Sequence, residues 1–148
     1  MCYIVHPSDT APALAALGAV CRISGPSASR SVAVESLHVS PTEDPQRETV
    51  LGPNEILTEI ILPAAAQGQR SSYRKVRTRG AWDFALAGVA LAIVFDGDTV
   101  RSARIFLSGA APVPWRVKAA EAAIVGTTLD AATIAKAAAA TVYGAEPL

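Results

Sequence analysis

Few side chains in this 148-residue chain have the types and spacing that would let them do chemistry on their own. No nucleophile is paired with a base, no two carboxylates form an acid–base pair, and no histidine stands at metal-ligand spacing from a cysteine. His6 is alone before Pro7, and we interpret it as structural and not as a general base. Any chemistry of this chain is therefore expected to belong to a bound cofactor.

The glycines predict no phosphate-binding loop. There are ten of them, and the sequence contains neither Gly-Gly nor Gly-x-Gly. A phosphate-binding loop needs closely spaced glycines because its backbone amides must converge on the phosphate. The residues of this chain alone therefore show no cradle for the phosphates of a nucleotide.

The two cysteines, Cys2 and Cys21, stand outside any Cys-x-x-Cys pattern. The simpler interpretation is two small buried thiols in a reducing compartment, and a disulfide between them stays open as the alternative. Two thiols are too few for an iron–sulfur cluster, which is usually held by four cysteines.

Composition and charge exclude several classes of protein. Hydrophobic residues make up 51% of the chain, which argues against disorder. Thirteen basic residues balance thirteen acidic ones, so no net field favours nucleic acid or an anionic membrane. The longest apolar stretch, residues 84–95, is shorter than the ~20 residues of a membrane span. Because polar residues from His6 onward interrupt any signal peptide, we expect a cytoplasmic protein, or a periplasmic one exported together with a partner.

The hydrophobic pattern predicts an α+β fold in two parts. In the first part, Ser8 or Asp9 can cap a short helix that ends at Gly18, and Gly25-Pro26-Ser27 can turn one strand back onto the next. The predicted elements of this part are strands at 2–5, 19–24, 31–34 and 55–62, a helix at 10–17, and a polar loop at 41–53.

The second part follows a linker of small residues at 64–71. It is predicted to contain strands at 72–77, 85–95 and 100–108. A first helix is expected from near Pro114 to Gly126, and a second one after the cap Asp130. The apolar face of the second helix is predicted to comprise Ile134, Ala138 and Val142. A three-stranded antiparallel sheet covered on one face by two helices satisfies this pattern.

Four segments, each weak alone, form a specific combination through their order and spacing. They are the Cys-x-x-x-His-Pro-Ser-Asp start with its continuation at 2–19, then residues 51–63, 73–86 and 109–126. Together they resemble the FAD-binding (medium) subunits of molybdenum hydroxylases, the family of xanthine dehydrogenase, aldehyde oxidoreductase and CO dehydrogenase flavoproteins. The Tyr-Arg-Lys-Val-Arg run at 73–77 is most similar to the bacterial aldehyde oxidoreductase branch.

The resemblance covers nearly the whole chain but only the carboxyl-terminal half of the family's subunit. It implies that residues 1–63 are the end of an FAD-binding domain, an antiparallel sheet with a short helix. Residues 72–148 are then a CO-dehydrogenase-flavoprotein-type carboxyl-terminal domain, a three-stranded antiparallel sheet with two helices. The family's glycine-rich segments, which hold the FAD pyrophosphate, would precede this chain, and further sequence would follow it.

The resemblance also assigns roles to three residues. Asp9 matches a family aspartate that accepts hydrogen bonds from the ribityl or ribose region of FAD; its alternative is a helix cap. Lys75 matches a family lysine near the isoalloxazine ring, where a cation favours reduced flavin; its alternative is a solvated lysine on an edge strand. Leu57 matches a position that packs on the flavin or adenine surface; its alternative is an ordinary core leucine.

The function implied by the resemblance is electron transfer. A substrate would be hydroxylated at the molybdenum cofactor of a large subunit, electrons would pass through [2Fe–2S] clusters of a small iron–sulfur subunit, and FAD on this subunit would deliver them to an acceptor. The chain is then an incomplete oxidoreductase subunit. Two alternatives stay open: an assembly module of such a complex that binds no FAD, and an unrelated small α+β binding domain.

Overall fold

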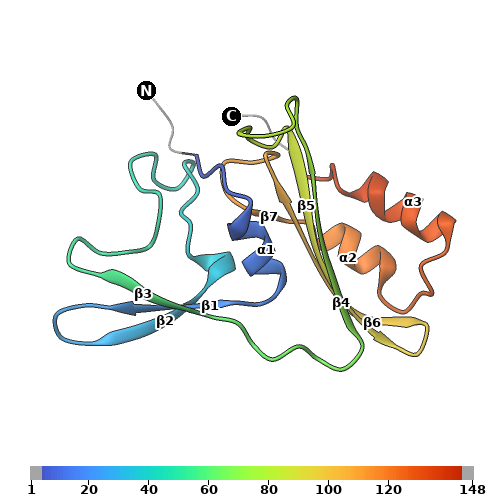
Figure 1. Ribbon diagram of the computed structural model, residues 1–148, viewed down its shortest axis with the longest axis horizontal. Helices are drawn as coiled ribbons and strands as arrows, with labels where there is room; N and C mark the ends of the chain where they lie inside the picture. Colours follow the sequence, from blue (N-terminus) through green and yellow to red (C-terminus); the bar gives the residue numbers. More distant parts are fainter. Residues whose placement is uncertain (1–4, 145–148) are drawn as a thin grey trace.

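The computed structural model describes residues 5–144 (Figure 1). Its elements are α1 (Thr10–Ala16), β1 (Val20–Ser24), β2 (Ser29–Ala33), a 3-10 helix η1 (Val34–Ser36), β3 (Ile56–Ile61), β4 (Gln69–Val76), β5 (Ala87–Asp96), β6 (Thr99–Ser108), β7 (Trp115–Arg116), α2 (Lys118–Ile124) and α3 (Ala131–Ala140). The strand predicted at 2–5 lies almost wholly outside the described residues, as does Cys2. In the described range no helix combines the length and the apolarity that crossing a membrane requires.

The strands form two antiparallel sheets, which confirms the predicted α+β class. The first sheet has the order β2-β1-β3 and the second has the order β4-β5-β6-β7. The long β5–β6 pair turns at Gly97, whose φ of 57° lies in the left-handed region that glycine tolerates. The second sheet therefore has four strands where the sequence predicted three, because β7 pairs with β6.

The helix expected to begin near Pro114 begins at Lys118 instead, so this prediction was wrong. Trp115 and Arg116 pair with β6 as a short strand, and the Arg116 guanidinium is held by the Glu121 carboxylate. Strand pairing outweighs the local preference for a helix after proline. The cap of the next helix is confirmed, because Asp130 Oδ1 accepts the backbone N–H of Thr133 at 2.7 Å.

The predicted apolar face of α3 was also wrong. Its buried residues are Ala137 and Ala140, whereas Ile134 is 53% exposed and Val142 is 71% exposed. Small alanines let α3 lie close to α2, so the contact is made by the small side chains and not by the large ones.

Helices cover both faces of the four-stranded sheet, where the sequence predicted helices on one face only (Figure 1). On β5 the side chains alternate: Ala90 and Ala92 join a core with α1, and Val89, Leu91 and Ile93 pack against the core with α2 and α3. Helix α1 also packs on β1, where Cys21 is a free, fully buried thiol. The two parts of the chain therefore share one core through α1.

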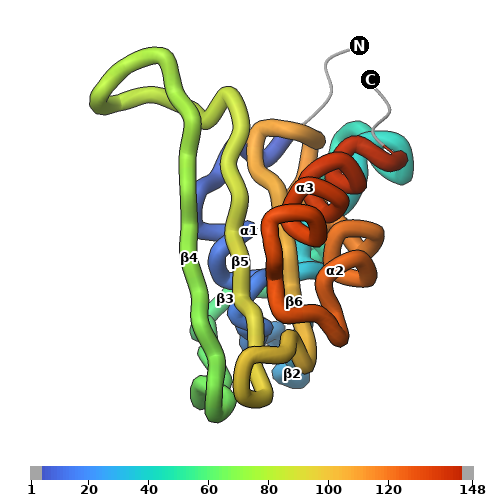
Figure 2. Tube along the Cα trace, turned by 90° about the vertical axis from the view of Figure 1, so that its right-hand side faces the viewer, coloured from blue at the N-terminus to red at the C-terminus, as the bar shows by residue number. Residues whose placement is uncertain are grey.

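The edge strand β4 lies beside the start of α1. Figure 2 shows β4, β5 and β6 side by side, with α2 and α3 in front of the β6 side. Strand β4 is an edge strand of this sheet, and it carries Tyr73 and Lys75 beside α1. The end of β4 and the start of α1 are consequently neighbours, although they are far apart in the sequence.

Candidate functional site

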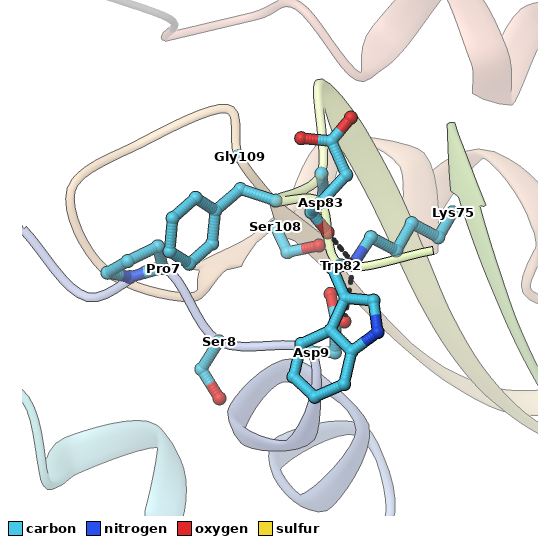
Figure 3. A pocket seen from close by; sticks show the side chains of 10 residues that line it. Pro7, Ser8, Asp9, Lys75, Trp82, Asp83, Ser108 and Gly109 are labelled. Carbon is cyan, nitrogen blue, oxygen red and sulfur yellow. Dashed lines mark hydrogen bonds and ion pairs between the residues drawn. The ribbon is translucent and has the colours of Figure 1, made fainter. Parts of the chain in front are cut away.

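A pocket of about 340 Å³ lies where the start of α1 meets the ends of β4 and β6 (Figure 3). Its wall is built by four segments that come from both parts of the chain. The lining residues are Pro7, Ser8, Asp9, Lys75, residues 82–85, Ser108 and Gly109. Two of the three residues that the sequence singled out, Asp9 and Lys75, are therefore brought together here.

Asp9 does not cap α1 with its side chain, although it stands at the capping position. Ser8 takes that role, because its hydroxyl accepts the backbone N–H of Ala11 at 3.0 Å. The Asp9 carboxylate instead accepts from Lys75 Nζ at 2.7 Å and from the Tyr73 hydroxyl at 2.7 Å. These two hydrogen bonds, that of Lys75 first, lower the pKa of Asp9, so the carboxylate is ionised at neutral pH.

Lys75 is held between two oxygens. Its ammonium donates to Asp9 and, at 2.7 Å, to the backbone carbonyl of Asp83 (Figure 3). Its side chain is 17% exposed, so the solvated-lysine alternative does not describe it. Since an ammonium has three N–H donors, and two are used within residues 5–144, one donor is left for a ligand in the pocket.

Tyr73 is a site residue that the sequence analysis missed. Its hydroxyl donates to Asp9 and lies 3.2 Å from the hydroxyl of Ser108. Burial raises the pKa of Tyr73, so the phenol stays protonated. The signal that could have revealed it is the strand period, because Tyr73 and Lys75 are two apart and share a face of β4.

The contact between Tyr73 and Ser108 needs a glycine at position 88. A Cβ atom at Gly88 would collide with the Ser108 hydroxyl and lie 2.9 Å from the Tyr73 hydroxyl. Gly88 pairs with both Lys75 on β4 and Ser108 on β6. A glycine in the middle of the sheet here makes room for polar side chains at the pocket wall.

The loop between β4 and β5 forms the outer rim of the pocket. The Asp83 carboxylate accepts from the Thr78 hydroxyl and, at 3.1 Å, from the backbone N–H of Arg79, and these bonds lower its pKa. Trp82 is held at a φ of 53°, unusual for a residue with a side chain, and is 96% exposed. Phe84 is 71% exposed. Two flat aromatic rings thus stand open beside the pocket.

Leu57 is not part of this site. It lies on β3, opposite Ile23 of β1, and is partly buried against the core that includes α1. The structure therefore separates it from Asp9 and Lys75. Its contact with a flavin or adenine stays a prediction.

The pocket combines groups that suit a flat ligand with hydroxyl groups. Asp9 and Ser108 can accept hydrogen bonds, Lys75 can donate one, and Trp82 offers a ring face. The volume is at the low end of the roughly 300–1,000 Å³ of small-molecule sites, so this pocket fits a part of an FAD molecule and not all of it. Among residues 5–144 no group of three or more His, Cys, Asp or Glu is placed to hold a metal ion.

Two family models match the chain. Residues 71–148 match the CO dehydrogenase flavoprotein C-terminal domain. Residues 1–65 match the FAD binding domain in molybdopterin dehydrogenase. The border between the two matches falls within the stretch 64–71 that composition suggested as a linker.

Individual relatives agree with these matches. The chain is 39% identical over 122 residues to the aldehyde oxidoreductase FAD-binding subunit PaoB of Escherichia coli (strain K12), covering 82% of this chain and 37% of that protein. It is 32% identical over 143 residues to the carbon monoxide dehydrogenase medium chain of Hydrogenophaga pseudoflava, covering 96% of this chain and 48% of that one. The structure of reconstituted CO dehydrogenase from Oligotropha carboxidovorans superposes with a TM-score of 0.83 at 28% identity, over 95% of this chain and 47% of that chain. This chain thus spans less than half the length of these relatives.

Proposed function

Because this chain belongs to the family of FAD-binding medium subunits of molybdenum hydroxylases, we propose that it is the part of such a subunit that holds the flavin end of FAD. Within the 1–63 and 72–148 division predicted from the sequence, the pocket lies where the two domains meet. Each domain supplies one member of the central ion pair, Asp9 from the first and Lys75 from the second.

The observation that carries this proposal is the cluster of Asp9, Tyr73 and Lys75. Tyr73 and Lys75 lie 64 and 66 positions from Asp9 in the sequence, yet each donates a hydrogen bond to its carboxylate at 2.7 Å. The carboxylate lies at the wall of the pocket. In this arrangement Asp9 would accept hydrogen bonds from hydroxyl groups of the cofactor, and Lys75 would offer its remaining N–H to the flavin. Tyr73 keeps the Asp9 carboxylate in place.

The open aromatic rings at the rim support the same ligand. Trp82 and Phe84 are among the most exposed large apolar side chains of the described residues, and both line the pocket. A planar ring system that enters the pocket would cover them and remove apolar surface from water. Arg77, whose charge also lowers the pKa of Asp9, adds positive charge near the pocket, which favours an anionic cofactor.

The proposed task is electron transfer within a larger oxidoreductase. When bound, FAD accepts electrons from iron–sulfur clusters and passes them to an acceptor. The chain would work beside a large subunit with the molybdenum cofactor and a small subunit with [2Fe–2S] clusters. The similarity to an aldehyde oxidoreductase FAD-binding subunit supports an aldehyde as the substrate of the complete enzyme. The residues of this chain bind and orient FAD and set the charge around it.

A titration of the purified chain with FAD tests this proposal against the alternative of an assembly module. Each amide hydrogen bond to a charged phosphate is worth ~1.5–3 kcal/mol, and the glycines show no loop that would supply several. We therefore expect saturable but weak binding, with FAD lost on gel filtration. Binding should weaken further in Lys75→Ala, whereas Lys118→Ala on α2 is the matched control. No saturable binding at millimolar FAD would favour the assembly module.

A further inference from the structure

The geometry of the proposed pocket depends on where α1 stands on the four-stranded sheet. Asp9 directly precedes α1, whereas Lys75 and Tyr73 belong to the sheet. On β5 the contact is made by alanines, since Ala15 and Ala16 of α1 share a core with Ala90 and Ala92, while β6 adds the fully buried Phe106. Alanine side chains are short and interlock little, so on β5 packing alone does little to fix the position of this short helix.

A polar contact holds the other end of α1. Arg104 on β6 donates to the backbone carbonyl of Ala15 from Nε at 3.1 Å and from Nη2 at 2.8 Å. The same carbonyl accepts the backbone N–H of Gly18 at 3.0 Å, so Arg104 adds to a helix end that is already closed by the backbone. A cation at this position also meets the negative end of the helix dipole. The seven-residue helix is thus held at both ends, at its start by the contact of Asp9 with Lys75 of β4 and at its end by Arg104 of β6.

Arg104 is itself held in place by a chain of ion pairs. Glu35, in η1, accepts from Arg104 at 2.9 Å and from Arg116 at 3.1 Å. Arg116 binds both carboxylate oxygens of Glu121, which is 7% exposed and also accepts the backbone N–H of Ile105. The guanidinium groups of Arg104 and Arg116 lie 5.5 and 5.9 Å from the ring centre of Phe106. No group of this network lines the pocket.

We propose that Arg104 is a positioning residue for the pocket, which sets the place of Asp9 relative to Lys75 by holding the carboxyl end of α1. The importance of this for FAD rests on the proposed function, but the coupling itself is a property of the chain alone. Arg104 would act through the helix, since it contacts Ala15 and not the pocket. Glu35 orients Arg104 and would act one step further away.

Arg104→Lys is the variant that separates position from charge. Lysine keeps the positive charge beside Glu35 but loses the two-pronged contact with Ala15. The readout is the pH titration of the Asp9 side-chain carboxyl carbon by NMR. In the unchanged chain the pKa of Asp9 is lowered, and in Arg104→Lys we expect it to rise toward the usual value of about 3.9. Arg101→Lys, an exposed position on the same strand, is the control and should leave Asp9 unchanged.

An unchanged Asp9 titration in folded Arg104→Lys would overturn the proposal, even if the variant is less stable. If Arg104→Lys does not fold, Glu35→Gln replaces it, and the same rise and the same overturning result apply. A second measurement uses FAD: Arg104→Lys should weaken its binding by up to about tenfold, and the loss should vanish in an Asp9→Asn background. An equal loss in both backgrounds would also overturn the proposal. If no variant binds FAD, the proposed function fails, while the NMR titration still decides on the coupling.

Discussion

The two faces of the four-stranded sheet are built differently, although the same strands make both. Toward α1, β5 presents the small side chains of Ala90 and Ala92, and beside them β6 presents the fully buried Phe106. Toward α2 and α3 it presents Val89, Leu91 and Ile93, which belong to a core of larger aliphatic residues. The large side chains leave an apolar groove of about 500 Å³ beside α3, with almost no polar surface.

The polar contacts of the candidate site gather on the other face, where the side chains of β5 are small. The contacts of Asp9 with Tyr73 and Lys75, and of Arg104 with Ala15, all lie on the α1 face. The comparison teaches that stability and specificity are divided between the faces. The α2–α3 face contributes mainly hydrophobic burial, which has no preferred direction, together with one buried carboxylate, Glu121, that accepts from Arg116 and from the backbone N–H of Ile105. The α1 face contributes directed bonds, which hold the start of α1 against the end of β4 at the wall of the pocket.

The largest expected effect is on the α2–α3 face. Ile124 of α2 is 3% exposed and belongs to the core of that face. Truncating a buried isoleucine to alanine costs about 2–5 kcal/mol, so Ile124→Ala should lower the free energy of unfolding by that amount. Urea unfolding measures it. The Asp9 titration should not change in the same variant, and a change there would break the division between the faces.

A substitution in the sheet should disturb the α1 face next. Gly88→Ala places a Cβ against the hydroxyls of Ser108 and Tyr73, and such overpacking costs about 1–3 kcal/mol. Because the Tyr73 hydroxyl must move, the pKa of Asp9 should rise in this variant. Gly80→Ala is the control, since no atom lies within 4 Å of a Cβ at that position. Because Lys75 alone keeps the pKa of Asp9 below its ordinary value, the deciding result is the change: an Asp9 pKa that does not rise in Gly88→Ala would show that Tyr73 does not hold the carboxylate.

The stability of the protein should also depend on pH, through His38 in the segment between η1 and β3. Burial, followed by repulsion from His6, lowers the pKa of His38 to about 4, and the nearby Glu48 opposes this shift. The unfolded chain therefore binds more protons between about pH 6.5 and pH 4, so stability is present above pH 6.5 and is lost as the pH falls toward 4. After allowance for partial exposure, the loss is about 1 kcal/mol.

Urea unfolding at pH 7 and pH 5 measures the contribution of His38. The carboxylates whose pKa is lowered, Asp9 and Glu55 among them, lose most of their stabilisation only below their ordinary pKa values of 3.8 and 4.5, under this window. His38→Gln should remove most of the difference between the two pH values. A difference of the same size in His38→Gln would assign the pH dependence to other groups.

The smallest expected effect is on the potential of FAD in a complete subunit. Lys75→Ala removes the cation that we propose lies beside the ring, so it should lower the potential by ~20 mV, which corresponds to about 1 kcal/mol for a two-electron couple. Asp9→Asn removes the paired anion and should raise it. Potentiometric titration measures both. Shifts of the same sign would contradict the proposed position of the pair next to the ring.

The local parts of this fold could be predicted from the sequence. The Asp130 cap and the turn at Gly97 depend on a few neighbouring residues, and both are present. The start of α2 could not be predicted, because Arg116 pairs with Phe106 ten positions away along the chain. The exposed side of α3 depends on how closely two alanine faces approach, which periodicity does not report.

For the site, the sequence could identify Asp9 and Lys75 but not their contact. Of the two interpretations of Asp9, the helix cap is excluded because the Ser8 hydroxyl caps α1, and the contact of Asp9 with FAD stays a prediction. Tyr73 and Gly88 were missed because their importance appears only when α1 lies on the sheet. Long-range packing, and not any local pattern, brings these side chains together.

The most direct test of the central claim is to map FAD binding on the chain by amide NMR, which detects even millimolar dissociation constants. We predict that added FAD shifts the amides of Asp9, Lys75, residues 82–85 and Gly109, and that Asp9→Asn reduces these shifts. Shifts that gather instead in the apolar groove beside α3, or no shifts at millimolar FAD, would contradict the claim that the α1 face carries the flavin site.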